Sequence, residues 1–243
     1  MLRILFPKRF ATSRQSAQTL CTRRIRVKKF IVGLLATVGM SANAGQTTGK
    51  VDVNSILYSM PTISGDAIEY KMPDEKSFNG APQFHEDDWC QLEFFAKSRL
   101  DDIQKKLTEY KAFELKNRTG SGWKEIYVRN IQRNKLSLNT KALGALKRAK
   151  VQPAPILTTA SRSLGQVKNG FSVSLGEGAL LYGVEQEGQI VSLAATVYSD
   201  EGNQALTSSF MALDKLEKLI LVDWRGQMII MGGSDGKLGV WKP

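Results

Sequence analysis

The sequence predicts an α+β fold, in which a long amphipathic helix and a shorter helix pack on strands and a C-terminal antiparallel β-meander follows. The first observation is a helical period of apolar residues that begins at Glu86 and ends near Asn117. The second is a series of strand-like runs in residues 169–243, which glycine-centred turns separate. A chain counted from Gly45 to Pro243 buries roughly 70% of its unfolded surface, enough to form a core without a disulfide.

The N-terminal residues carry the pattern of a cleavable export signal. The basic pair Lys28 and Lys29 precedes the apolar stretch Phe30–Met40, and an Ala-x-Ala end follows at Ala44. This apolar stretch is too short for a stable membrane anchor, because a helix needs roughly 20 residues to cross a bilayer. We therefore expect cleavage near Ala44 and a periplasmic or secreted product.

Residues 1–29 contain nine basic residues and no acid, which leaves other interpretations of the leader open. An acid-free leader is also typical of a mitochondrial presequence. Thr22-Arg23-Arg24 resembles a twin-arginine signal, except that Arg26 stands where that pattern has an apolar residue. We favour a start at Val27 from an alternative bacterial initiation codon, with residues 1–26 not translated.

Residues 45–82 are predicted to form an extended arm with one or two short strands. Short apolar pieces such as Ile56–Tyr58 alternate with Gly, Ser and Asp, and Pro61, Pro73 and the Asn79-Gly80 pair interrupt any longer element. The arm leads into a helix–strand–helix region, residues 83–152.

The first element of that region is predicted to be one helix from Glu86 to about Asn117. Acidic residues at its start suit the positive end of the helix dipole, and Asp101 stands four residues before Lys105 on the polar face. The apolar positions that share one face are Trp89, Leu92, Ala96, Leu100, Ile103, Leu107 and Tyr110.

A strand and a shorter helix are predicted next. Trp123–Ile131 is rich in β-formers, and Leu138–Lys150 follows the helical pattern from an N-cap at Asn139 or Thr140. A Pro-x-Pro pair at 153–155 closes the region, and we place a boundary between two lobes there.

The last region, residues 153–243, is predicted to be an antiparallel β region packed with the one before it. Glu187-Gly188 and Arg225-Gly226 are among its turn signals. The stretch Ala205–Leu216 is ambiguous between strand and helix. The predicted strands are Ala179–Val184, Ile190–Tyr198, Leu219–Trp224, Met228–Met231 and Leu238–Trp241.

The net charge of +11 falls to +2 once residues 1–44 are removed, so the charge gives no reason to predict nucleic-acid binding. The charge that remains is uneven along the chain. Residues 51–94 contain nine acids and two bases, whereas residues 95–150 contain fifteen bases and five acids. Two interpretations stay open: the segments neutralise each other, or the basic segment meets anionic lipid, cell-wall polymer or an acidic protein.

Large aromatic residues are the candidate binding residues, because such side chains dominate protein interfaces. We select Trp89, Phe94, Phe113 and Trp123 as partner-binding residues. The resulting hypothesis is an exported periplasmic interaction protein without catalytic activity. It would bind a protein partner as a toxin inhibitor or immunity factor, or as part of an envelope assembly. No cofactor is predicted, and the oligomeric state stays open.

The alternative hypothesis is an envelope hydrolase, dependent on a metal or on carboxylates. Its site would use the cluster His85, Asp87, Asp88 and Cys90, which contains the one histidine of the chain and the one cysteine after residue 44. His85 and Cys90 lie five residues apart, a spacing that does not share a helix face. A helix start over a buried tryptophan and cysteine is the simpler interpretation.

Overall fold

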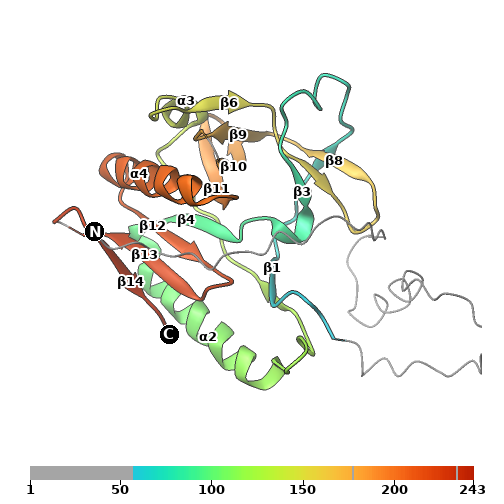
Figure 1. The fold of residues 1–243 in the computed structure, drawn as a ribbon, viewed down its shortest axis with the longest axis vertical. Helices are drawn as coiled ribbons and strands as arrows, with labels where there is room; N and C mark the ends of the chain where they lie inside the picture. Colours follow the sequence, from blue (N-terminus) through green and yellow to red (C-terminus); the bar gives the residue numbers. More distant parts are fainter. Residues whose placement is uncertain (1–56, 177, 234) are drawn as a thin grey trace, which may run out of the picture.

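The computed structural model describes residues 57–243 except 177 and 234 (Figure 1). The predicted export signal, its cleavage site at Ala44 and residues 45–56 of the arm lie outside the described residues. Within the described ranges, no helix is both long enough and apolar enough to span a bilayer.

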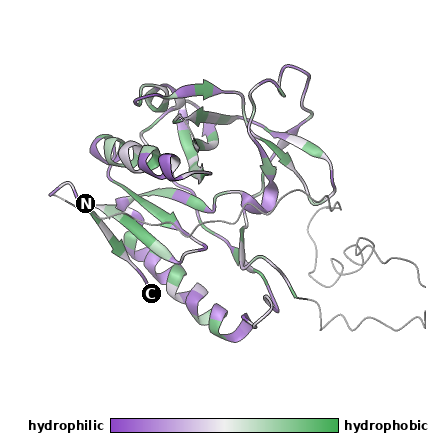
Figure 2. Ribbon diagram, in the orientation of Figure 1, coloured by the Kyte–Doolittle hydropathy of each residue, from purple (hydrophilic) through white to green (hydrophobic). Residues whose placement is uncertain are grey.

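The largest element is an eight-stranded sheet in which every neighbouring pair of strands is antiparallel. In spatial order, its strands are β14 (Leu238–Trp241), β13 (Met228–Gly232), β12 (Leu219–Asp223), β4 (Leu92–Ala96), β11 (Gln189–Val197), β10 (Ala179–Gln186), β9 (Gly170–Ser174) and β6 (Lys150–Gln152). Figure 2 shows the hydrophobic colour along the strands in the middle of this sheet, where both faces are covered.

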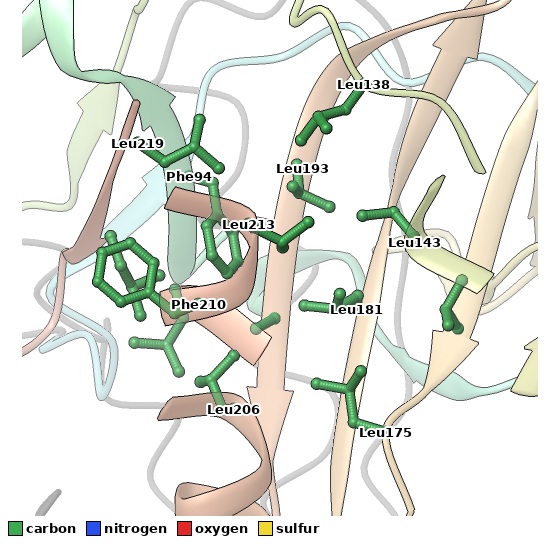
Figure 3. Packing of buried hydrophobic residues seen from close by; sticks show 14 of the residues in the cluster. Phe94, Leu138, Leu143, Leu175, Leu181, Leu193, Leu206, Phe210, Leu213 and Leu219 are labelled. Atoms are coloured by element: carbon green, nitrogen blue, oxygen red, sulfur yellow. The ribbon is translucent and has the colours of Figure 1, made fainter. Parts of the chain in front are cut away.

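Two helices cover opposite faces of the sheet. Helix α4 (Asp200–Leu216) packs its Leu206, Phe210 and Leu213 against one face, where Phe94 and the other labelled side chains of Figure 3 converge. Helix α2 (Leu100–Asn117) packs against the opposite face. Side chains alternate between the faces along a strand, so neighbouring residues of β4 contribute to different cores.

A second sheet lies beside α2 on the same face. It orders β2 (Tyr70–Lys71), β8 (Leu164–Val167), β7 (Ile156–Thr158) and β3 (Gln83–His85), and it packs on β10 and β11 through a third hydrophobic core. A parallel pair, β1 (Thr62–Ser64) and β5 (Tyr127–Arg129), forms a third, two-stranded sheet. Among the described residues, the other helical segments are α3 (Thr140–Gly144) and the 3-10 turns η3 (Glu86–Asp88) and η4 (Lys97–Arg99).

The α+β prediction is confirmed, and so are the five C-terminal strands. Glu187 and Gly188 link β10 to β11 as a two-residue turn with φ of 51° and 74°, the left-handed geometry that matches the twist of a hairpin. The ambiguous stretch is helical: α4 begins after Ser199, whose side chain accepts a hydrogen bond from the backbone N–H of Gly202. The strands are not one continuous meander, because β4 lies between β11 and β12.

The long helix is correct only from Leu100 onward. Residues 92–96 form β4, a central strand with β11 on one side and β12 on the other. The run Leu-Glu-Phe-Phe-Ala is buried on both faces, and a short apolar run of this kind cannot be told from a buried helix by periodicity. The helix ends at Asn117, as predicted.

The next two elements are shorter than predicted. The strand expected at Trp123–Ile131 is reduced to β5, and the helix expected at Leu138–Lys150 is α3, of five residues. Its predicted start is correct, because the Asn139 side chain accepts a hydrogen bond from the N–H of Ala142.

Candidate interaction surface

Two of the four predicted partner-binding residues lie in the core. Trp89 is 1% exposed and packs with Tyr182, at 5.1 Å between ring centroids. Phe94 is 2% exposed and faces Phe210 of α4. Both are excluded as contact residues, because a partner reaches neither without opening the fold. The helical period predicts a helix surface at both positions, where the structure has a turn and a central strand.

The other two, Phe113 and Trp123, are partly exposed at the C-terminal end of α2. The ring of Phe113 lies 5.3 Å from that of Tyr127 on β5, which fixes one of its faces. Trp123 follows a tight loop and exchanges two backbone hydrogen bonds with Tyr58, of 2.7 and 2.9 Å. The loop itself is closed by Thr119, whose N–H and hydroxyl both donate to the carbonyl of Gly122.

Two exposed leucines belong to the segments next to this loop. Leu115, in the last turn of α2, is 77% exposed, and Leu57 is 37% exposed. A methyl group added at Gly122 would lie 3.2 Å from the Cβ of Leu57, so that side chain sits directly over the loop. We call the end of α2 and this loop the tip surface; its residues are Leu57, Phe113, Leu115, Arg118 and Trp123. Leu115 and Arg118 stand three residues apart on one side of the helix, and Arg118 pairs with Trp123, whereas Phe113 lies on the other side.

A buried carboxylate holds the tip surface on the sheet. Glu114 accepts hydrogen bonds from Lys111 and Arg118 on its own helix, both at 2.8 Å, and from Gln227 in the β12–β13 turn at 2.7 Å. Burial works against ionisation of Glu114, but these three donors outweigh it and lower its pKa. The carboxylate therefore stays charged and ties the last turns of α2 to the β12–β13 turn.

The alternative cluster of His85, Asp87, Asp88 and Cys90 is dispersed. The side chain of His85 caps η3, and its Nδ1 lies 3.1 Å from the carboxylate of Asp87. The carboxylate of Asp88 forms an ion pair with the guanidinium of Arg225 at 2.8 Å. Among residues 57–243 without 177 and 234, no three His, Cys, Asp or Glu side chains are grouped so as to hold a metal ion. The proposed four-ligand site is not assembled.

Cys90 is fully buried, in a left-handed backbone conformation with φ of 54°. Burial raises the pKa of its thiol to about 12. A thiol in this setting is neutral, which makes it a poor nucleophile and a poor metal ligand.

A buried polar cluster that the sequence pattern does not predict lies on the face of the eight-stranded sheet that α2 covers. Arg133 forms ion pairs with Glu93 and with Asp66, and the Glu93 carboxylate also accepts from the indole nitrogen of Trp224 at 2.9 Å. Arg129 donates to the Cys90 carbonyl at 3.0 Å, and its guanidinium lies 5.2 Å from the Trp224 ring centroid. These five residues are mutually engaged, which indicates a structural role.

One small hollow opens beside this cluster, lined by Phe95, Arg99, Arg133 and residues of β11. It accommodates about one water molecule. Arg99 is engaged by Asp102 and by the carbonyl of Gln132, and Arg133 by its two carboxylates, so this hollow does not present free charged groups to a substrate.

Neither a protein-family model, nor a curated protein sequence, nor a solved structure matches this chain. The function is therefore inferred from the geometry of the tip surface and from the chemistry of the described side chains.

Proposed function

We propose that this protein is an exported interaction protein that binds a protein partner through the tip surface, as a toxin inhibitor or immunity factor or as part of an envelope assembly. The observation that carries this proposal is the exposure of apolar side chains around the end of α2 and on the segment that packs on the following loop, with Leu115 the most exposed among them. The leader pattern of Lys28–Ala44 is what supports an envelope location.

The tip surface has the composition of a binding surface and the rigidity that binding favours. Tryptophan, arginine and exposed leucine stand together, and tryptophan and arginine are the residues most enriched at binding hot spots. Phe113 is braced by Tyr127, and Arg118 is braced by Glu114. Side chains that are already fixed lose little conformational entropy when a partner binds.

The rim of the tip surface is mainly basic. Lys116 and Lys124 are exposed, and Lys111 and Arg118 share the single carboxylate of Glu114. Glu125 is the acid in the same loop region. A partner with an acidic rim around an apolar centre fits this arrangement, since complementary charges at the rim steer association.

The test is capture of a partner from a native envelope extract with two matched variants. Leu115→Glu places a charge in the tip surface, whereas Leu216→Glu makes the same change at an exposed leucine, 66% accessible, that ends α4. We expect the wild type and Leu216→Glu to retain one stoichiometric partner and Leu115→Glu to lose it.

The same preparation separates binding from enzymatic function. Purified wild-type protein is assayed for bound metal, and the captured partner is titrated against both variants by calorimetry. A partner retained with equal affinity by Leu115→Glu and Leu216→Glu would remove the tip surface from the proposal. Absence of any stoichiometric partner, together with a retained metal ion, would contradict the binding function itself.

A further inference from the structure

The corner formed by α3 and β6 concentrates positive charge at the edge of the eight-stranded sheet. We define the basic corner as Lys141, Lys147, Arg148 and Lys150, all of which are exposed. Figure 1 shows α3 and β6 at the rim of the molecule, far from the tip surface at the end of α2. Arg148 adopts φ of 63°, in the tight turn that leads from α3 into β6.

The charge of this corner is not neutralised by the ion pairs found among the described residues. Residues 126–176 contain nine bases and no acid. Three of these bases, Arg133, Lys135 and Lys168, form ion pairs with carboxylates from other segments. The four residues of the basic corner take part in none of the described pairs. The nearby carboxylate of Glu185 accepts hydrogen bonds from the backbone N–H and the hydroxyl of Thr140.

The second observation concerns the backbone. β6 pairs with β9 on one side only, because it is the last strand of the sheet. An edge strand presents unpaired N–H and C=O groups. Val151, in the middle of β6, is 53% exposed. Backbone pairing groups, an exposed apolar side chain and a set of cations therefore occupy one edge.

The positive charges determine which kind of strand can pair with β6. A lysine on an edge strand discourages pairing with a second copy of the same strand, because like charges would then face each other. Pairing with an acidic strand is favoured instead, because its carboxylates would lie opposite the cations of the basic corner. The short length of β6, three residues, limits pairing to a short segment.

We propose that β6 binds an extended acidic segment of a protein as a ninth strand of the sheet, with its carboxylates against Lys147, Arg148 and Lys150 and an apolar side chain against Val151. Addition of a peptide strand to a sheet edge is a common mode of recognition, in which the backbone supplies affinity and the side chains supply specificity. The proposal does not depend on the tip surface, and its variants leave that surface unchanged.

The probe is a fluorescein-labelled ten-residue peptide of alternating Glu and Val, and binding is measured by fluorescence anisotropy. The perturbing variant is Lys147→Glu/Lys150→Glu. The matched control is Lys105→Glu/Lys215→Glu, which changes the net charge equally at two other exposed lysines, one on α2 and one on α4. We expect the affinity to fall at least tenfold in the first variant and less than twofold in the second.

A second peptide tests strand pairing separately from charge. It has the same sequence, but alternate backbone nitrogens are methylated, which removes the N–H donors that pair with an edge strand. We expect at least tenfold weaker binding of this peptide to the wild type, and slower amide exchange in residues 150–152 with the unmethylated peptide alone.

Three results would overturn the proposal. Equal affinity for the two peptides would show an ionic contact without strand addition. Equal losses in the two double variants would show non-specific attraction. Binding of phosphatidylglycerol vesicles without binding of the acidic peptide would identify a membrane-facing surface instead. Lys147→Ala/Lys150→Ala, with near-ultraviolet circular dichroism as a check of folding, gives the same test without introducing acids.

Discussion

Replacement of Glu114 by methionine tests the link between the fold and the tip surface. The substitution keeps the length of the side chain and a good helix former, but it removes the acceptor of three hydrogen bonds. Glu114 is 6% exposed, so solvent does not replace the lost acceptor readily for the amide of Gln227 behind it.

The expected loss of stability follows from these three contacts. Lys111 and Arg118 are 44% and 66% exposed, so each pair contributes at most about 0.5 kcal/mol. The amide nitrogen of Gln227 is buried, and leaving it without an acceptor costs about 1–3 kcal/mol. We expect Glu114→Met to lower the free energy of unfolding by about 2–3 kcal/mol at pH 7.

The dependence on pH separates charge from packing. The pKa of Glu114 is lowered in the folded protein, so its contribution is present above the ordinary value of 4.5 and is lost as the pH falls through the folded pKa. Urea unfolding, followed by tryptophan fluorescence, should therefore show a smaller difference between variant and wild type at pH 3 than at pH 7. An equal difference at both values would refute the electrostatic explanation and leave packing.

Three further predictions concern groups outside the tip surface. Glu93→Gln should lower the free energy of unfolding by about 2–4 kcal/mol, because it leaves Arg133 with one buried partner fewer. Asp102→Asn, at an exposed ion pair, should change it by under about 0.5 kcal/mol. Both values are measured by urea unfolding, and similar losses in the two variants would contradict the structural role of the Glu93–Arg133 pair. In a chain beginning at Gly45, Cys90 should react with a thiol reagent in urea but not in the native state, as mass spectrometry would show. A hydrogen bond with Asp87 raises the pKa of His85, and the neutral ring still caps η3, so the loss of stability in His85→Ala should stay under about 1 kcal/mol and be larger at pH 5.5 than at pH 8.5; a loss that grows with pH would contradict this linkage.

The sequence was most informative where one local pattern decides the structure. The Glu187-Gly188 turn between β10 and β11 and the N-cap Asn139 have local physical causes, and both were predicted correctly, whereas Gly202, a third expected turn residue, lies in α4. The run at residues 92–96 has no such local cause. Its strand conformation depends on β11 and β12, whose partners are distant in sequence, and a helical period fitted the same residues.

The exposure of the four aromatic candidates was half predictable for a related reason. Phe113 and Trp123 were selected as large aromatics, and the end of the helix beside them was placed correctly at Asn117. The prediction that Trp89 and Phe94 are exposed depended on a helix that begins at Glu86. The structure has a turn and a strand there, both side chains are buried, and the prediction is wrong. Leu115 was not selected, because a leucine has no sequence signal that distinguishes an exposed position from a buried one when the helix face is assigned by period alone.

The buried arginines show why the polar cluster is needed despite its desolvation cost. Burial lowers the pKa of Arg129 to about 10, yet the guanidinium remains charged at neutral pH. The cluster fixes the register of β4, because a shift by one residue would turn Glu93 toward the apolar core under α4 and bring Phe94 against Arg133. An unpaired carboxylate in that core is far more costly than a misplaced apolar side chain. The pairing of Glu93 with Arg133 therefore excludes the alternative register, and the correct register in turn places β12 and its turn where Gln227 can hold the end of α2.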